Sequence, residues 1–96
     1  MIVSFREGAT EDLYHGIASA RARRFPQNVA TRALDKLAVL DAAVDVNDLR
    51  VPPGNHLEQL RGDLAGCWSI RVNQQWRIVF KWEGGNAAEV RLVDYH

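Results

Sequence analysis

The feature that most constrains this chain is a regular alternation of apolar and polar residues near its C-terminal end. Trp68, Ile70 and Val72 alternate with polar residues, and after a short break Trp76, Ile78, Phe80 and Trp82 follow the same pattern. Alternation with a period of two is typical of strands that bury one face. The break, Asn73-Gln74-Gln75, is short enough to join the two runs into an antiparallel hairpin.

A third strand is predicted after the turn signal Glu83-Gly84-Gly85-Asn86, where Val90 and Leu92 alternate with polar residues. All three apolar sets must face one core, because a register slip of one residue would turn a whole set to solvent. The opposite face is then predicted to be exposed and cationic, with Ser69, Arg71, Arg77, Lys81, Arg91 and Tyr95 on it. We expect this face to carry the functional site, and Arg77 to be removable without leaving a cavity.

Two helices are predicted in the N-terminal half. The first is short and starts at Thr10 as its N-cap. The second follows Pro26, where Val29, Ala33, Leu37, Leu40 and Val44 recur every three or four residues and form one apolar stripe. Residues 19–25 hold three arginines between the two helices, either as a frayed helix end or as a mobile basic loop.

The remaining segments complete a single predicted domain over residues 1–96. Residues 2–5 are short, apolar and β-prone, and are expected to add a strand to the sheet. Asp45 is expected to cap one further helical turn, which Pro52 and Pro53 end, and Leu57 and Leu60 begin the sheet. Helices that are segregated from an antiparallel sheet define the α+β class.

Composition is that of an ordinary globular protein, with 47% hydrophobic and 25% charged residues. No apolar run approaches the roughly 20 residues of a membrane span, and no signal-peptide core is seen, so we expect a cytoplasmic protein. The single cysteine, Cys67, excludes an internal disulfide and fits a reducing compartment. It is either a nucleophile paired with a histidine or, as we favour, a small filler beside a buried tryptophan.

Formal net charge is zero, so the whole chain carries no general signal for a polyanion. Ten arginines stand against two lysines, and the planar arginine fork suits phosphate, although the same residues also serve as solvated surface charge. The three histidines and Cys67 never fall at metal-ligand spacing, and no nucleotide-binding glycine motif is present. We therefore expect neither a metal nor a cofactor.

The residues left for chemistry are polar groups that a sheet can bring together at its strand ends. They are Arg61, Arg71, Arg77, Asp94, Tyr95 and His96, with His56 and Glu58 nearby in sequence. Such a cluster suits cleavage of an RNA phosphodiester by its own 2′-hydroxyl, which needs a base, cations for the phosphorane and an acid for the leaving oxygen. The alternative is a charged face that only keeps a small protein in solution.

Several stretches resemble the HigB-type toxins of the RelE/ParE superfamily. They are Pro52-Pro53-Gly54-Asn55-His56-Leu57-Glu58, Leu60-Arg61-Gly62-Asp63, Gly66-Cys67-Trp68-Ser69-Ile70-Arg71-Val72-Asn73-Gln74-Gln75-Trp76-Arg77-Ile78 and Val93-Asp94-Tyr95-His96. The resemblance extends over essentially the whole chain. It implies a RelE-like fold, with two N-terminal helices packed on a curved antiparallel β-sheet. It also implies a ribosome-dependent mRNA endoribonuclease that cuts in the A site without a metal.

The resemblance also assigns roles to residues. It makes Arg77 the transition-state arginine, gives catalytic roles to Asp94, Tyr95 and His96, and places Arg61 at a basic position before Gly-Asp. RNA or ribosome contacts are expected from Arg23, Arg24, His56, Arg71 and Lys81. Some members carry a histidine two or three residues before the basic position. Here Glu58 and Gln59 stand there, so the second proton-transfer group is not assigned.

The implied partners are the ribosome with its mRNA and a helix-turn-helix antitoxin of the HigA type. Operator DNA would be contacted only through the antitoxin, and no membrane is expected. A second hypothesis is a ParE-like inhibitor that binds gyrase and cuts nothing, and a third is an inert interaction domain. Arg77 together with Asp94-Tyr95-His96 favours the nuclease, because an inhibitor has no evident need for these residues.

Overall fold

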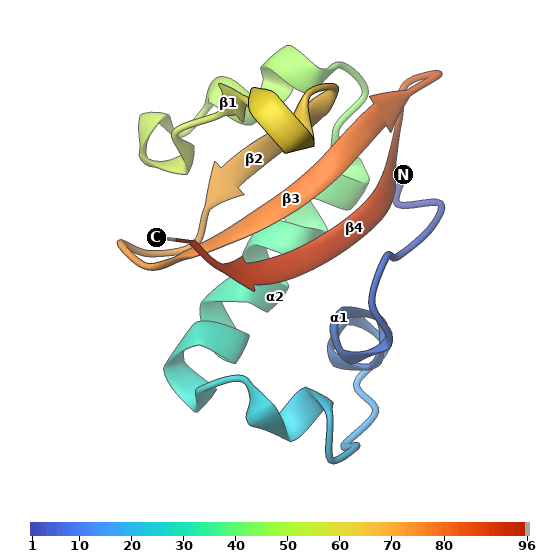
Figure 1. Ribbon diagram of the computed structural model, residues 1–96, viewed down its shortest axis with the longest axis vertical. Helices are drawn as coiled ribbons and strands as arrows, with labels where there is room; N and C mark the ends of the chain where they lie inside the picture. The colour runs from blue at the N-terminus through green and yellow to red at the C-terminus, as the bar shows by residue number, and fades with distance from the viewer. Residues whose placement is uncertain (96) are drawn as a thin grey trace.

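The computed structural model describes residues 1–95, and its order of elements confirms the α+β prediction (Figure 1). Helix α1 spans Gly8–Tyr14 and helix α2 spans Gln27–Ala42. The antiparallel sheet has the order β1-β2-β3-β4, with strands Glu58–Gln59, Cys67–Arg71, Trp76–Glu83 and Asn86–Asp94. Short 3₁₀ turns cover Ala22–Arg24 (η1), Val46–Arg50 (η2), Pro53–Asn55 (η3) and Gly62–Leu64 (η4).

The main core lies between α2 and one face of the sheet, as the helical and strand periods predict. Val29, Ala33, Leu37 and Leu40 of α2 are buried against Ile70, Val72, Ile78, Phe80, Val90 and Leu92 of the strands. Each fully buried leucine contributes about 1.5–3 kcal/mol. The predicted stripe is wrong at its last position, because α2 ends at Ala42 and leaves Val44 81% exposed. The extended backbone of Ala43 turns that alanine into the core instead.

Both predicted hairpins are present and each has a local cause. The side-chain oxygen of Asn73 accepts hydrogen bonds from the backbone N–H groups of Gln75 and Trp76, both at 2.8 Å, and so closes the turn between β2 and β3. Between β3 and β4, Gly84 and Gly85 have φ values of 58° and 79°. A two-residue hairpin loop with both φ values positive follows the right-handed strand twist, and glycine adopts it without strain.

Helix α1 starts earlier than predicted, because the role of Thr10 is tertiary. The helix begins at Gly8 with Glu7 as its N-cap, so the prediction that Thr10 caps it is wrong. Thr10 is completely buried, and its hydroxyl accepts a hydrogen bond of 3.0 Å from the backbone N–H of Leu92 in β4. One side chain therefore fastens α1 to the sheet.

The arginine-rich segment between the helices folds as an ordered turn, η1. The carboxylate of Asp12 in α1 accepts hydrogen bonds from Arg21 at 2.6 Å and from Ser19 at 2.7 Å. The Arg21 bond first, and then the Ser19 bond, lowers the pKa of Asp12. Gly8 lies against the Arg21 guanidinium, where an added Cβ would lie 2.1 Å from Nη1. The ion pair and this close contact fix the course of the segment.

The chain before α1 pairs with β4, although it forms no regular strand there. Ile2 and Phe5 make isolated parallel bridges to Ala87 and Val90, where the sequence predicts a full strand over residues 2–5. Asp45 caps η2 as predicted, and Asp48 completes the capping box. No helix within residues 1–95 is long and apolar enough to cross a membrane.

Replacing Thr10 by valine is expected to destabilise the fold by about 1–3 kcal/mol, since it leaves the buried N–H of Leu92 without an acceptor. Urea denaturation followed by tryptophan fluorescence measures this change. Thr31→Val is the matched control, because Thr31 is exposed on α2, and we expect a change within about 0.5 kcal/mol. Equal stability of the two variants would contradict a tertiary role for Thr10.

Candidate active site

The face of the sheet opposite α2 is partly covered by residues 53–66, which fold back across its edge (Figure 1). Strand β1 pairs with β2 there, and Leu60, Cys67 and Val79 form a second, smaller core. The prediction of a fully exposed cationic face is therefore wrong for Ser69 and Arg77, which are 0% and 8% exposed. Alternation predicts on which face of the sheet a side chain lies. It does not predict that a distant segment of the chain covers that face.

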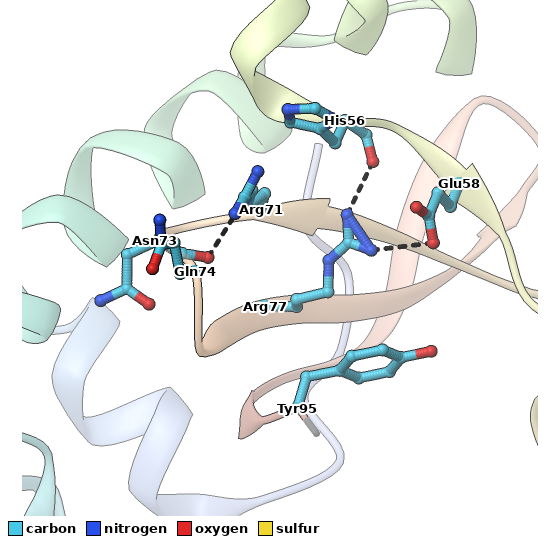
Figure 2. A pocket seen from close by; sticks show the side chains of 7 residues that line it. All are labelled: His56, Glu58, Arg71, Asn73, Gln74, Arg77 and Tyr95. Carbon is cyan, nitrogen blue, oxygen red and sulfur yellow. Dashed lines mark hydrogen bonds and ion pairs between the residues drawn. The ribbon is translucent and has the colours of Figure 1, made fainter.

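Arg77 is held on this face by two other parts of the chain, residues 56–58 and the end of β4 (Figure 2). Its Nη1 donates to Glu58 Oε2 at 2.9 Å, and its Nη2 donates to the backbone oxygen of His56 at 2.9 Å. The ring of Tyr95 lies beneath the guanidinium, 5.5 Å from Cζ to the ring centre. The guanidinium is thus fixed before any ligand arrives.

A cavity of about 200 Å³ opens beside Arg77. Its lining consists of His56, Glu58, Arg71, Asn73, Gln74, Arg77 and Tyr95. Arg71 is oriented by a hydrogen bond of 3.1 Å from its Nε to the backbone oxygen of Asn73. Two guanidinium groups, one carboxylate, one imidazole and one phenol thus surround a space open to solvent. An anionic group there would meet arginines suited to bidentate contacts.

At the end of β4, the side chains of Asp94 and Tyr95 line different clefts. The backbone N–H of Tyr95 donates to the oxygen of Gln75 at 2.6 Å, which ties the chain to the hairpin turn and places the ring in the cavity. Asp94 lies opposite Trp76 in the β3–β4 register, and its carboxylate accepts a hydrogen bond from the Gln75 side chain. It lines a different cleft, together with Arg21 and Arg24. His96 lies outside the described residues.

Four of the other predicted site residues, Arg23, Arg24, Arg61 and Lys81, do not line the cavity. Arg61 is exposed beyond β1, and Arg23 and Arg24 lie on η1. Lys81 is paired with Glu89 at 2.9 Å, an interaction that raises the pKa of Lys81 and lowers that of Glu89. Of the five predicted RNA contacts, His56 and Arg71 line the cavity. The roles assigned to all these residues from sequence stay predictions.

The sequence assigns no role to three cavity residues: Glu58, which is named only as near the candidate cluster along the chain, and Asn73 and Gln74. Strand β1 is only two residues long, too short for a pattern to show that Glu58 pairs with β2 and faces Arg77. Cys67 lies within the second core, which agrees with its interpretation as a filler. Among residues 1–95, no three His, Cys, Asp or Glu side chains are grouped to hold a metal ion.

Comparisons with known proteins point to one family. Residues 3–96 match the family model for the HigB-like toxin, a RelE-like toxin of type II toxin–antitoxin systems. The chain is 40% identical over 92 residues to toxin HigB-1 of Vibrio cholerae, covering 96% of this chain and 95% of that protein. It is 33% identical over 97 residues to endoribonuclease HigB of Proteus vulgaris, covering 100% of both.

The fold is also similar to a solved structure, a YoeB–YefM complex from Staphylococcus aureus. The TM-score is 0.62 at 18% identity, and the match covers 100% of this chain and 98% of that chain. The RelE-like fold predicted from sequence, with helices packed on a curved antiparallel sheet, is thereby confirmed.

Removal of the Arg77 side chain is expected to weaken the fold as well as the site. Arg77→Ala should lower the free energy of unfolding by about 1–3 kcal/mol, because a buried aliphatic stem and two hydrogen bonds are lost. Arg91→Ala, on the neighbouring strand, is the control and should change stability by at most about 0.5 kcal/mol. Chemical denaturation of both variants tests this, and wild-type stability of Arg77→Ala would contradict it.

Proposed function

Because this chain belongs to the HigB family of RelE-like toxins of type II toxin–antitoxin systems, we propose that it is an endoribonuclease that cuts mRNA in the ribosomal A site. The observation that supports this best is the fixed guanidinium of Arg77, which faces a cavity together with a carboxylate and a phenol. The relative from Proteus vulgaris is named an endoribonuclease, which agrees with this proposal.

The proposed reaction is attack of a 2′-hydroxyl on the adjacent phosphorus. A base removes the hydroxyl proton, the oxygen bonds to phosphorus, and the 5′-oxygen leaves with a proton from an acid. The products are a 2′,3′-cyclic phosphate and a free 5′-hydroxyl. Arg77 and Arg71 would stabilise the negative charge that develops on the phosphorane, because both face the cavity and each is held by a hydrogen bond.

We assign the base to Glu58, whose carboxylate is the only one in the cavity lining within residues 1–95. One oxygen accepts from Arg77, so the other is left to receive a proton. The Glu58 side chain is 55% exposed and can reach a bound nucleotide. Glu58 would thus fill the position at which the resemblance expects a histidine in some members.

The acid for the leaving oxygen is proposed to be His96, the residue after Tyr95. Tyr95 lines the cavity, is 38% exposed, and would position the reacting nucleotide by stacking. Asp94 would support His96 and Arg61 would contact phosphate, as the family resemblance implies. These roles rest on the sequence, since the structure does not describe residue 96 and places Asp94 and Arg61 outside the cavity lining.

The ribosome is the proposed partner that orders the mRNA, and this would place the protein in the cytoplasm. The cavity is small and open to solvent, so a flexible RNA would not be held in line for attack. A HigA-like helix-turn-helix antitoxin is the proposed inhibitor, and operator DNA would be met only through it. The ParE-like alternative gains no support from the family match.

Purified protein should leave naked RNA largely intact and cut mRNA on programmed ribosomes. The physical reason is orientation, since holding reactants near attack geometry supplies much of the rate. Incubation of one labelled mRNA with and without ribosomes measures the ratio of the two rates. Equal cleavage of both substrates would exclude ribosome dependence, whereas arrested growth with intact mRNA and poisoned gyrase would favour the ParE-like alternative.

Glu58→Gln should reduce the single-turnover rate by about 10²–10⁴-fold, the range that general base catalysis contributes. The amide oxygen can still accept the hydrogen bond from Arg77, so the melting temperature should stay near that of the parent. Glu83→Gln, an exposed carboxylate at the far end of β3, is the matched control and should cut normally. Parental activity of Glu58→Gln would show that another group is the base.

A further inference from the structure

A second, larger cleft lies directly beside the catalytic cavity. Its volume is about 550 Å³, and it is lined by Arg32, Lys36, Gly54, His56, Arg71, Val72, Asn73 and Gln74. Four of these residues, His56, Arg71, Asn73 and Gln74, also line the catalytic cavity, so the two spaces adjoin. Figure 2 shows Arg71 and Asn73 side by side at this boundary, next to Arg77.

The larger cleft is cationic in a chain whose formal net charge is zero. Within residues 1–95, Arg32, Lys36 and Arg71 line it, no carboxylate does, and none of the three forms an ion pair. Arg32 and Lys36 lie four residues apart on α2, a spacing at which like charges repel and weaken a helix. An anionic ligand would relieve this repulsion.

Two of these cations are oriented by neutral groups. Lys36 Nζ donates to the side-chain oxygen of Asn55, which is fully buried and donates in turn to the backbone oxygens of Leu49 and Val51. Arg71 Nε donates to the backbone oxygen of Asn73. Each side chain is held while its charge stays uncompensated, so less ordering is needed when a ligand binds.

We propose that this cleft binds the phosphodiester backbone of the mRNA beside the scissile phosphate, with Arg32 and Lys36 contacting phosphates and Arg71 leading into the catalytic cavity. The inference rests on the proposed nuclease function of that cavity. Within residues 1–95 no Phe, Tyr or Trp side chain lines the cleft, and the proposed contacts of Arg32 and Lys36 are to phosphates of the backbone. Because Arg32 and Lys36 lie on α2, the proposed path of the RNA runs from the catalytic cavity toward that helix. Lys81 lies at the other end of the β2–β3 pair and would not contact this part of the RNA.

The test measures binding of the protein to ribosomes programmed with an mRNA that carries a 2′-deoxy nucleotide at the cut site. Arg32→Gln combined with Lys36→Met should raise the half-saturating concentration at least about tenfold, the worth of one lost charged hydrogen bond. Arg6→Gln combined with Arg50→Gln removes the same charge from exposed sites outside the cleft and should bind like the parent. Equal weakening of both pairs, or no weakening of the first, would overturn the proposal.

Phosphates of the mRNA are distinguished from those of ribosomal RNA by replacing single mRNA phosphates near the cut site with neutral methylphosphonates. At one or two positions the replacement should weaken binding of the parent protein to the ribosome. It should not weaken binding of the Arg32→Gln, Lys36→Met variant any further, because that variant has already lost the contact. Additive losses at every position would overturn the assignment to mRNA. If the double variant loses stability, Arg32→Gln alone, at an exposed position, serves the same cycle.

These experiments distinguish failure of the proposed nuclease function from failure of the proposed backbone site. A parent that binds with this coupling but leaves ordinary mRNA uncut would refute the proposed function and leave the backbone site standing. A parent that cuts mRNA while the cycle stays additive would refute the backbone site alone. Absence of any binding to programmed ribosomes would overturn both.

Discussion

A single buried charge organises the functional side of this protein. Arg77 belongs to the strand that carries the core, yet its guanidinium is enclosed between Glu58, the backbone of His56 and the ring of Tyr95. A charge removed from water must be compensated, so the segment that crosses the sheet has to supply an acceptor where Arg77 lies. The same contacts that satisfy the charge also fix the group proposed to stabilise the phosphorane. Fold and site are therefore not independent here.

The enclosure leaves Arg77 able to bind an anion. A guanidinium has five N–H donors, and two of them are used in the bonds to Glu58 and His56. The remaining donors are available to a phosphate in the cavity, without displacement of Glu58. The two proposed roles thus belong to different groups: the carboxylate of Glu58 receives a proton, while the guanidinium of Arg77 keeps its position. Preorganised donors of this kind need little rearrangement during reaction.

Local patterns predicted those parts of the structure that local forces determine. The alternation from Trp68 to Trp82 gave the hairpin and the buried face, and the stripe on α2 gave the main helix packing. The errors fall where distant segments meet. Thr10 is buried by β4 instead of capping a helix, and Arg77 is covered by a two-residue strand. Glu58 could not be placed in the site because its neighbour in space, Arg77, is 19 residues away along the chain.

The distribution of charge explains how a chain with no net charge can offer a polyanion a binding surface. On other parts of the molecule, Arg21 is paired with Asp12, and Lys81 with Glu89. Among residues 1–95, the two adjoining clefts instead hold four cations, Arg32, Lys36, Arg71 and Arg77, against one carboxylate, Glu58. In physiological salt, screening limits the range of electrostatic interactions between exposed charges to about 8 Å. A bound strand would therefore interact with this local excess of positive charge and not with the net charge of the chain. Attraction from a distance is correspondingly weak, and affinity has to come from contacts made once the strand is in place.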